Sequence, residues 1–439
     1  MGRRKLEREL AVAMNGLEVG RWTVAAQGEH RFRYSAEWLG RAAAIPISLS
    51  MPLSSEPFRG EPVWNYFDNL LPDNADIRRR LQARLGAKSM QPFDLLAGIG
   101  GDCVGALQIH PPDEVPLDVR RVDADALDDA AIADVLRNYR DQPLGITREG
   151  EFRISIAGAQ EKTALLKRDG RWYRPRRATA TSHILKLPIG PGASGIDMTD
   201  IVENEWLCLR LAEALGLPVP KAEMQTFADQ RVLVVERFDR RWAEDGSWLM
   251  RVHQEDFCQA LAVSPGVKYE ADGGPGVRQS FELLRRSREP EVDRRTFFRA
   301  LVVYWLLAGI DGHAKNFSLF LLPGGRCRMT PLYDVLSAFP VVARKQLHER
   351  RLKMAMAVLG TSRHYEWHGV MRRHWLSTAQ QVRLPQADAL GVLRDVVARG
   401  PQAVAEVRSL LPPGFPDAVA GPILDGVERA LARLAAGDQ

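Results

Sequence analysis

Short segments that alternate apolar and polar side chains dominate the first part of the chain. Four of them have the pattern of half-buried strands: residues 11–14, 17–19, 32–34 and 47–51. Asn15-Gly16 separates the first two and favours the positive φ angles of a type I′ hairpin turn. An arginine-rich helical pattern follows at 74–85, before an acidic, proline-punctuated stretch at 111–143. We therefore expect a β-rich subdomain over residues 1–148.

A second β-rich unit is predicted over residues 149–237. Its strand patterns lie at 154–156, 163–166, 183–187 and 232–235, with a return strand starting at Trp172. One helix is expected from Thr199 to Leu215, closed by Gly216. This order of strand, loop, strands, helix and strand is typical of the N-lobe of a protein kinase.

The remainder, residues 238–439, is predicted to be mostly helical. Helical periodicity appears at 254–262, 294–310, 386–399 and 417–435. Strand character interrupts these helices only at 317–330. The predicted fold is therefore α+β and protein-kinase-like, with two lobes: a β-rich N-terminal region and a mostly α-helical C-terminal lobe.

Composition narrows the class of protein only moderately. The 439 residues are 45% hydrophobic and 26% charged, as in an ordinary globular chain, and the net charge of +5 permits an acidic partner without requiring one. The longest apolar stretch, 300–310, is too short to span a bilayer. Four scattered cysteines exclude a zinc ribbon and a disulfide scaffold. We expect four buried thiols and a cytoplasmic protein without an export signal.

The clearest candidate for a catalytic segment is residues 310–317. Asp311 and Asn316 have the D-x-x-x-x-N spacing of a kinase catalytic loop. The predicted hairpin at 317–330 should bring Asn316 and Asp334 to the same open end, where oxygen ligands suit Mg²⁺. Asp311 would accept the proton of a substrate hydroxyl. The structural alternative is a loop of polar capping residues beside an ordinary hairpin.

Two charged residues are expected inside apolar surroundings. Glu205 falls on the apolar stripe of the helix 199–215, and Lys186 lies in the middle of an apolar strand. A buried charge requires a partner. Pairing the two would reproduce the lysine–glutamate pair that orients ATP phosphates in kinases, with Glu203 as the substitute. The alternative is that both side chains reach solvent.

The loop 157–162 contains one glycine and matches neither G-x-G-x-x-G nor the Walker A motif. Its position between two strands, upstream of Lys186, is what favours a phosphate-binding role. Glu236 ends an apolar strand just before the helical half. A nucleotide hinge would lie there, with backbone groups of residues 236–238 available to adenine.

Eight segments together resemble one family, the HipA-type serine/threonine protein kinase toxins of bacterial type II toxin–antitoxin modules. The segments are Phe67–Asp73, Pro92–Leu96, Ser155–Lys162, His183–Pro188, Val235–Trp242, Gln254–Asp256, Asp272–Gly276 and Asp311–Ser318. The resemblance implies ATP- and Mg²⁺-dependent phosphorylation of a protein seryl hydroxyl. Glutamate-tRNA ligase is the known class of target, and the consequences are inhibited growth and persistence.

The resemblance also assigns roles to residues. Asp311 would be the base, and Asn316 and Asp334 the metal ligands. The ATP contacts implied by the family are Ala157, Gly158, Ala159, Gln160, Glu161, Lys162, Lys186, Glu236, Arg237, Phe238, His313, Ala314, Lys315, Asn316, Tyr333 and Asp334. Ser155 matches a serine that family members autophosphorylate. A phosphoserine there would repel ATP phosphates, so we expect the phosphorylated form to be inactive.

The implied partner is a helix-turn-helix antitoxin dimer, HipB-like, that holds the toxin on operator DNA; no membrane is involved. Residues 10 to 110 are the expected antitoxin-facing module. The stretch that matches the family's DNA contact is Gln380, Gln381, Val382 and Arg383, with Gln380 where a basic residue is expected.

Two other functions remain open on the sequence alone. Asp-x-His-x-x-Asn also resembles the loop of phosphoinositide kinases, so the substrate could be a lipid or small molecule, although no basic, aromatic-rich membrane segment is present. A non-catalytic transcriptional co-repressor is the other alternative. The intact set of Lys186, Asp311, Asn316 and Asp334 disfavours it. We expect these four side chains to converge on magnesium nucleotide between the two lobes.

Overall fold

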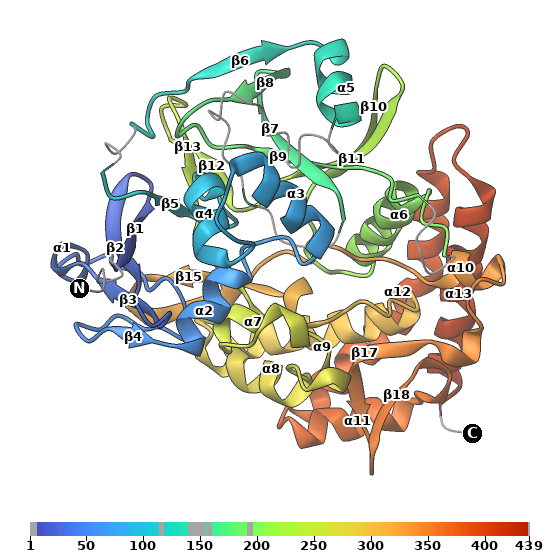
Figure 1. The fold of residues 1–439 in the computed structure, drawn as a ribbon. Coiled ribbons are helices and arrows are strands. Elements are labelled where there is room, and N and C mark those ends of the chain that lie inside the picture. The colour runs from blue at the N-terminus through green and yellow to red at the C-terminus, as the bar shows by residue number, and fades with distance from the viewer. Residues whose placement is uncertain (1–6, 114–117, 139–154, 156–159, 191–195, 438–439) are drawn as a thin grey trace. The chain divides into compact units, whose positions relative to one another are not determined.

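The computed structural model describes residues 7–113, 118–138, 155, 160–190 and 196–437. The chain divides into two compact units, of which one is rich in strands and the other mostly helical (Figure 1). Unit 1 contains residues 1–187, 225–266 and 319–327, and unit 2 contains 188–224, 267–318 and 328–439. The α+β class and the kinase-like fold are confirmed. The three-segment division expected from the sequence stays a prediction.

Unit 1 begins with a five-stranded sheet. Its strands, in spatial order, are β4 (Phe58–Arg59), β3 (His30–Tyr34), β2 (Leu17–Val24), β1 (Arg8–Met14) and β5 (Leu107–His110). The predicted hairpin is confirmed, since Asn15 and Gly16 have φ angles of 48° and 78°. Trp22 stacks on Phe67 at a centroid distance of 3.8 Å, at the centre of an apolar core. Four helices accompany the sheet (Figure 1): α1 (Ala36–Leu39), α2 (Glu61–Asp68), α3 (Ala75–Leu85) and α4 (Pro92–Ile99).

A six-stranded sheet follows in the chain. Its order is β10 (Ala222–Phe227), β11 (Gln230–Glu236), β9 (His183–Lys186), β7 (Lys162–Arg168), β8 (Arg171–Pro175) and β6 (Ala124–Leu127). The helix α5 (Asp129–Arg137) packs against β11. The antiparallel register of β7 and β9 sets Lys162 directly opposite Lys186. Directly opposite residues point to the same face of a sheet, so these two side chains are neighbours.

Several short strands complete unit 1 and correct one prediction. They are β12 (Arg240–Trp242), β13 (Leu249–Arg251), β14 (Gln254–Asp256), β15 (Ser318–Leu322) and β16 (Arg326–Met329). The last two form the predicted hairpin around the turn Pro323–Gly325. The helix expected at 254–262 is wrong for its first turn, because β14 pairs with β15. Only α7 (Phe257–Ala260) is helical there, started by a capping box between Asp256 and Gln259.

Unit 2 is built from helices around a buried aromatic core. They are α6 (Ile201–Ala214), α8 (Val277–Leu283), α9 (Pro290–Leu306), α10 (Phe339–Ala343), α11 (Arg372–Gln381), α12 (Gln386–Ser409) and α13 (Asp417–Ala436). α12 continues past Pro401, ten residues beyond the predicted end. A hairpin of β17 (Lys353–Leu359) and β18 (Arg363–Glu366) is a strand pair that the periodicity missed. Within the described ranges, no helix is long and apolar enough to cross a membrane.

The strand predicted at 47–51 is wrong. Only an isolated bridge joins Ser48 to Met51. The backbone donors of this segment bind side chains instead of a neighbouring strand: Ile47 N–H donates to the Tyr34 hydroxyl at 2.8 Å and Leu49 N–H to the Glu255 carboxylate at 2.7 Å. The alternation of apolar and polar residues at 47–51 thus reflects which side chains are buried, and the segment is not part of a sheet.

Candidate active site

The predicted catalytic loop lies just after the end of α9. The carbonyl oxygen of Asp311 accepts hydrogen bonds from Asn316 Nδ2 at 2.6 Å and from His313 N–H at 2.8 Å. His313 Nε2 lies 3.7 Å from Asp311 Oδ1. His313 and Asn316 are buried, whereas the Asp311 side chain is 44% exposed. The loop therefore fixes its own backbone and leaves a carboxylate accessible to a substrate.

Asp334 comes close to this loop through its neighbour. Tyr333 donates a hydrogen bond from its hydroxyl to the Lys315 carbonyl oxygen at 2.8 Å, and its hydroxyl also contacts Ser318. The two ends of the β15–β16 hairpin therefore lie side by side. Asp334 has a φ of 55°, a left-handed conformation that is uncommon for a residue other than glycine and concentrates at functional sites.

A buried phenol that the sequence did not reveal interacts electrostatically with the predicted carboxylates. Tyr304 is 2% exposed, and burial raises the pKa of its hydroxyl well above 10. The negative charges of Asp334, Asp311 and Glu205 raise this pKa further. Three carboxylates that were predicted separately thus act electrostatically on one buried side chain of unit 2. The apolar helical pattern that contains Tyr304 gave no sign of this.

A second tyrosine touches the predicted base itself. The Tyr269 hydroxyl donates a hydrogen bond to Asp311 Oδ1, and its ring packs edge-on against His313 with centroids 4.9 Å apart. Sequence reasoning missed Tyr269. The nearest signal was the segment Asp272–Gly276, which lies just after it.

The two predicted lysines of the phosphate site share one face of the six-stranded sheet. Lys162 and Lys186 are directly opposite and are 7% and 6% exposed. Glu205, on α6, is 2% exposed, as is Glu203. Burial excludes the alternative in which Lys186 and Glu205 reach solvent. Lys186 belongs to unit 1 and Glu205 to unit 2, and their pairing stays a prediction.

The phosphate loop is described only at its ends. Ala157, Gly158 and Ala159 lie outside the described residues, as does the predicted strand 154–156 apart from Ser155. Ser155 is buried, donates from Oγ to the Leu70 carbonyl at 2.7 Å and donates its N–H to the Asp102 carbonyl at 3.0 Å. At the other end, Gln160 Nε2 donates to the Leu187 carbonyl at 2.7 Å, and Glu161 forms an ion pair with Arg80 of α3.

The predicted hinge alternates between inward and outward residues. Glu236 is exposed and Phe238 half-buried, with its ring 5.8 Å from that of Phe320. Arg237 between them points inward, and its N–H donates to the Ser182 carbonyl at 2.9 Å. The backbone amide of Arg237 is therefore occupied within unit 1. Of the predicted hinge residues, Glu236 is thus exposed and Phe238 is partly accessible.

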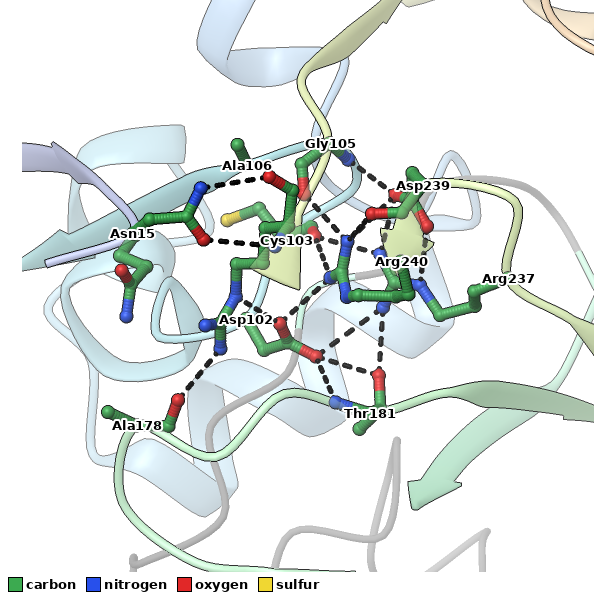
Figure 2. Close-up of polar contacts among 12 residues, drawn as sticks. Asn15, Asp102, Cys103, Gly105, Ala106, Ala178, Thr181, Arg237, Asp239 and Arg240 are labelled. Atoms are coloured by element: carbon green, nitrogen blue, oxygen red, sulfur yellow. Dashed lines mark hydrogen bonds and ion pairs between the residues drawn. The ribbon is translucent and has the colours of Figure 1, made fainter. Parts of the chain in front are cut away.

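Arg237 belongs to a buried ionic network that the sequence did not predict (Figure 2). Asp102 accepts hydrogen bonds from Arg240 and Arg251, each at 2.8 Å, while Arg237 binds Asp239 at 2.8 Å. Burial opposes ionisation of both carboxylates, but the guanidinium groups outweigh it. They hold the pKa of Asp102 well below its ordinary value and lower that of Asp239 to about 2.

The same network connects segments that are distant in the chain. Figure 2 shows Asp102 facing Thr181, Arg237 and Arg240, and the Thr181 hydroxyl donates to Asp102 at 2.7 Å. Asp239 accepts from the Gly105 N–H at 2.7 Å. Residues 102–105 of the N-terminal region are thereby bonded to the segment that immediately follows the predicted hinge.

The stretch predicted to meet DNA lies at the end of α11. Gln380 and Arg383 are exposed, whereas Val382 is buried. Gln381 and Arg383 line a hollow of about 410 Å³, together with Arg278 and other residues of α8 and its C-terminal end. Arg278 donates to the Gln381 side-chain oxygen. The hollow is therefore bordered by several guanidinium groups, although Gln380 itself is not basic.

The residues predicted to hold a metal are suited to Mg²⁺ shared with phosphates. Asn316 turns its amide nitrogen to the Asp311 carbonyl, so its amide oxygen and the Asp334 carboxylate are the oxygen donors that the prediction assigns to the metal. No cluster of three His, Cys, Asp or Glu side chains with metal-binding geometry exists among the described residues. Mg²⁺ characteristically uses one or two carboxylates plus substrate phosphates and water, so this sparse donor set fits it.

Comparison with known proteins identifies the family of the chain. The family model of the HipA-like C-terminal domain matches residues 154–404, and that of the HipA N-terminal domain matches residues 10–110. The putative kinase Y4mE of Sinorhizobium fredii is 39% identical over 346 residues, which are 77% of this chain and 80% of that protein. The serine/threonine-protein kinase toxin HipA of Shewanella oneidensis is 27% identical over 396 residues, 87% of this chain and 84% of that protein.

A solved structure shares the fold along nearly the whole chain. It is the complex of HipA, HipB and operator DNA from the toxin–antitoxin system of Shewanella oneidensis MR-1, with a TM-score of 0.80 and 24% identity. The match covers 98% of this chain and 97% of that one. Kinases of this kind use ATP with a divalent metal. Because both family domains are matched and one relative is 39% identical, the chain belongs to the HipA family and is a HipA-type serine/threonine protein kinase.

Proposed function

We propose that the chain is the toxin of a toxin–antitoxin module and transfers the γ-phosphoryl group of ATP to a seryl hydroxyl of a protein of translation, glutamate-tRNA ligase. The observation that carries this proposal is the loop around Asp311. An accessible carboxylate is held there by a buried backbone, directly beside the Tyr333–Asp334 segment. That arrangement suits a group that accepts the proton of an acceptor hydroxyl.

The proposed nucleotide contacts are the residues that the sequence predicts for this role. Lys162 and Lys186 place two positive charges on one face of the sheet, where the phosphates of ATP would neutralise them. Backbone groups of Glu236 and Phe238 would pair with adenine, while Gln160, Glu161, His313, Ala314 and Lys315 would complete the site. Glu205 would orient Lys186.

Asn316 and Asp334 would hold Mg²⁺, which neutralises negative charge on the transferring phosphoryl group when it is bound. The seryl oxygen attacks the γ-phosphorus as the bond to the ADP oxygen breaks. The seryl proton passes to the Asp311 carboxylate.

Ser155 is proposed as an inactivating autophosphorylation site. Its hydroxyl is buried and bonded to the Leu70 carbonyl, so a phosphate of about −2 charge does not fit in the described position. Phosphorylation would therefore displace the start of the phosphate loop. Ser155→Ala should remove the label and prolong activity. Unchanged ATP affinity in a fully phosphorylated sample would contradict the inactivation.

A HipB-like antitoxin dimer and its operator are the proposed partners. The named complex from Shewanella oneidensis contains HipB and operator DNA, and residues 10–110, which match the HipA N-terminal family model, would face the antitoxin. Arg383 and the hollow beside it are the proposed contact with DNA phosphates.

The test is label transfer from γ-labelled ATP with Mg²⁺, with and without glutamate-tRNA ligase and tRNA. We expect label on Ser155 and on the ligase with the wild type, none with Asp311→Asn, and wild-type amounts with Asp417→Asn, which changes an exposed carboxylate of α13. Label on Ser155 alone would refute the ligase as target. Equal labelling with Asp311→Asn would refute the role of Asp311.

A further inference from the structure

The segment 267–276 forms a tight turn that presents one side chain to the catalytic loop. The carbonyl oxygen of Tyr269 accepts the N–H groups of Asp272 at 3.1 Å and of Gly274 at 2.9 Å. Gly273 has a φ of 97°, and a Cβ on Gly274 would lie 2.0 Å from the Val267 carbonyl oxygen. The glycines in this motif are therefore required for the turn that holds Tyr269.

A second anchor fixes the same turn to β17. The side chain of Glu270 is buried and accepts the Ala357 N–H at 2.7 Å. Arg363 of β18 lies 3.6 Å from the other carboxylate oxygen. A Cβ on Gly276 would lie 2.2 Å from the Glu270 carboxyl carbon, so the turn packs closely around this carboxylate. Tyr269 is thus held on one side by backbone hydrogen bonds and on the other by the anchored Glu270 side chain, and none of these contacts involves Asp311.

From this support the Tyr269 hydroxyl reaches Asp311 Oδ1 and donates a hydrogen bond to it. His313 Nε2 lies 3.7 Å from the same oxygen, and the Tyr269 ring packs edge-on against the His313 ring. Asn316 meanwhile fixes the backbone carbonyl of Asp311. These contacts converge on one carboxylate oxygen and on the backbone, so Oδ2 is the oxygen that they leave to an incoming hydroxyl.

We propose that Tyr269 is a positioning residue for phosphoryl transfer: it holds Oδ1 of Asp311 so that Oδ2 faces the acceptor hydroxyl. This inference rests on the proposed role of Asp311 as the base. During transfer the acceptor proton passes to Oδ2, and the phenol of Tyr269 keeps its own proton. Without the phenol the carboxylate can rotate about its side-chain torsions, and fewer encounters have the geometry that proton transfer requires.

The decisive variant is Tyr269→Phe, which removes the hydroxyl and keeps the ring against His313. Hydrogen bonds to charged groups are among the stronger ones, so we expect kcat to fall about tenfold to a hundredfold. The KM for ATP should stay within twofold, since the hydroxyl that is removed acts on Asp311 of the catalytic loop. Tyr365→Phe is the matched control: it removes a half-buried phenol of β18 and should leave both constants unchanged.

Two rates are read for each protein: phosphate release from γ-labelled ATP, which requires no protein acceptor, and transfer to glutamate-tRNA ligase with tRNA. Melting temperatures report folding. Tyr269→Phe with wild-type kcat would overturn the inference, and so would a faster rate, because the phenol would then be occupying the place of the acceptor. Activity that survives in Asp311→Asn would instead refute the role of Asp311 itself.

A second variant tests the turn independently of the phenol. Gly274→Ala brings a methyl group against the Val267 carbonyl and should displace Tyr269. If the turn acts through Tyr269, Gly274→Ala lowers kcat in the wild type and has little further effect in the Tyr269→Phe background. An equal loss of kcat in the two backgrounds would contradict this, provided that the melting curves show both proteins to be folded.

Discussion

The charge balance of the buried network makes Asp102→Asn the most informative single change in unit 1. In the wild type, two carboxylates, Asp102 and Asp239, face three guanidinium groups, those of Arg237, Arg240 and Arg251. All five side chains are at most 5% exposed. Asparagine keeps the shape of Asp102 but leaves one carboxylate for three buried cations.

The magnitude follows from the loss of a buried partner. Removing one member of a buried ion pair typically costs about 3–5 kcal/mol, because the remaining charge stays uncompensated away from water. Two of the arginine contacts to Asp102 are 2.8 Å long, and Thr181 donates to it at 2.7 Å. The amide nitrogen of the introduced asparagine would also be a donor facing other donors. We expect the free energy of unfolding to fall by about 3–5 kcal/mol.

The assay is urea unfolding followed by circular dichroism, with Asp229→Asn as the control. Asp229 and Arg137 form an ion pair whose side chains are 62% and 43% exposed, so solvent screens the pair and its loss should change stability little. A loss in Asp102→Asn as small as that of Asp229→Asn would refute the reasoning. Because the network fixes the segment after the hinge, the KM for ATP should rise in Asp102→Asn and stay unchanged in the control.

The pH dependence of the same variant has a defined sign. The pKa of Asp239 falls from 3.8 to about 2 in the folded protein, and that of Asp102 is also lowered. Stability contributed by such groups is complete above the unfolded pKa and disappears as the pH falls through the folded one. The difference between wild type and Asp102→Asn should therefore be constant above about pH 5 and shrink below about pH 4.

Three further outcomes are expected. Lys186→Met and Lys162→Met should each weaken ATP binding at least tenfold by calorimetry with little change in melting temperature, and wild-type affinity in both variants would contradict the phosphate site. The pKa of buried His253 is lowered to about 4, so the wild type should lose stability of the order of 3 kcal/mol as the pH falls from 6.5 to 4; unfolding of His253→Gln should show a pH slope about one proton smaller. Arg383→Ala should lower the salt slope of operator binding by the antitoxin complex by about one, whereas an unchanged slope would exclude a phosphate contact.

Sequence patterns correctly predicted those elements whose backbone conformation depends on residues close together in the chain. The Asn15-Gly16 hairpin and the turn at 323–325 depend on residues that tolerate positive φ, and both appear where expected. Asp311 and Asn316 were found by spacing because the contact between them spans five residues.

Contacts between distant segments could not be read in the same way. Tyr269 lies 42 residues before Asp311, and Arg237 lies 135 residues after Asp102. No periodicity encodes such pairs, since each partner alone looks like an ordinary polar residue of a loop. The segment 47–51 failed for a related reason: its partners are side chains from residues 34 and 255, which strand patterns do not count.

Asp102 also bears on how far the enzyme could be shortened. The matched HipA-like C-terminal domain begins at residue 154, which suggests a catalytic portion that could be excised. Yet Asp102 supplies the carboxylate that neutralises Arg240 and Arg251 and the carbonyl that holds Ser155. A truncated chain starting at residue 154 would keep the three buried arginines and would lack the Asp102 carboxylate that they bind. The N-terminal region thus supplies part of the ionic core of unit 1, and we expect a chain that starts at residue 154 to be much less stable than the whole protein.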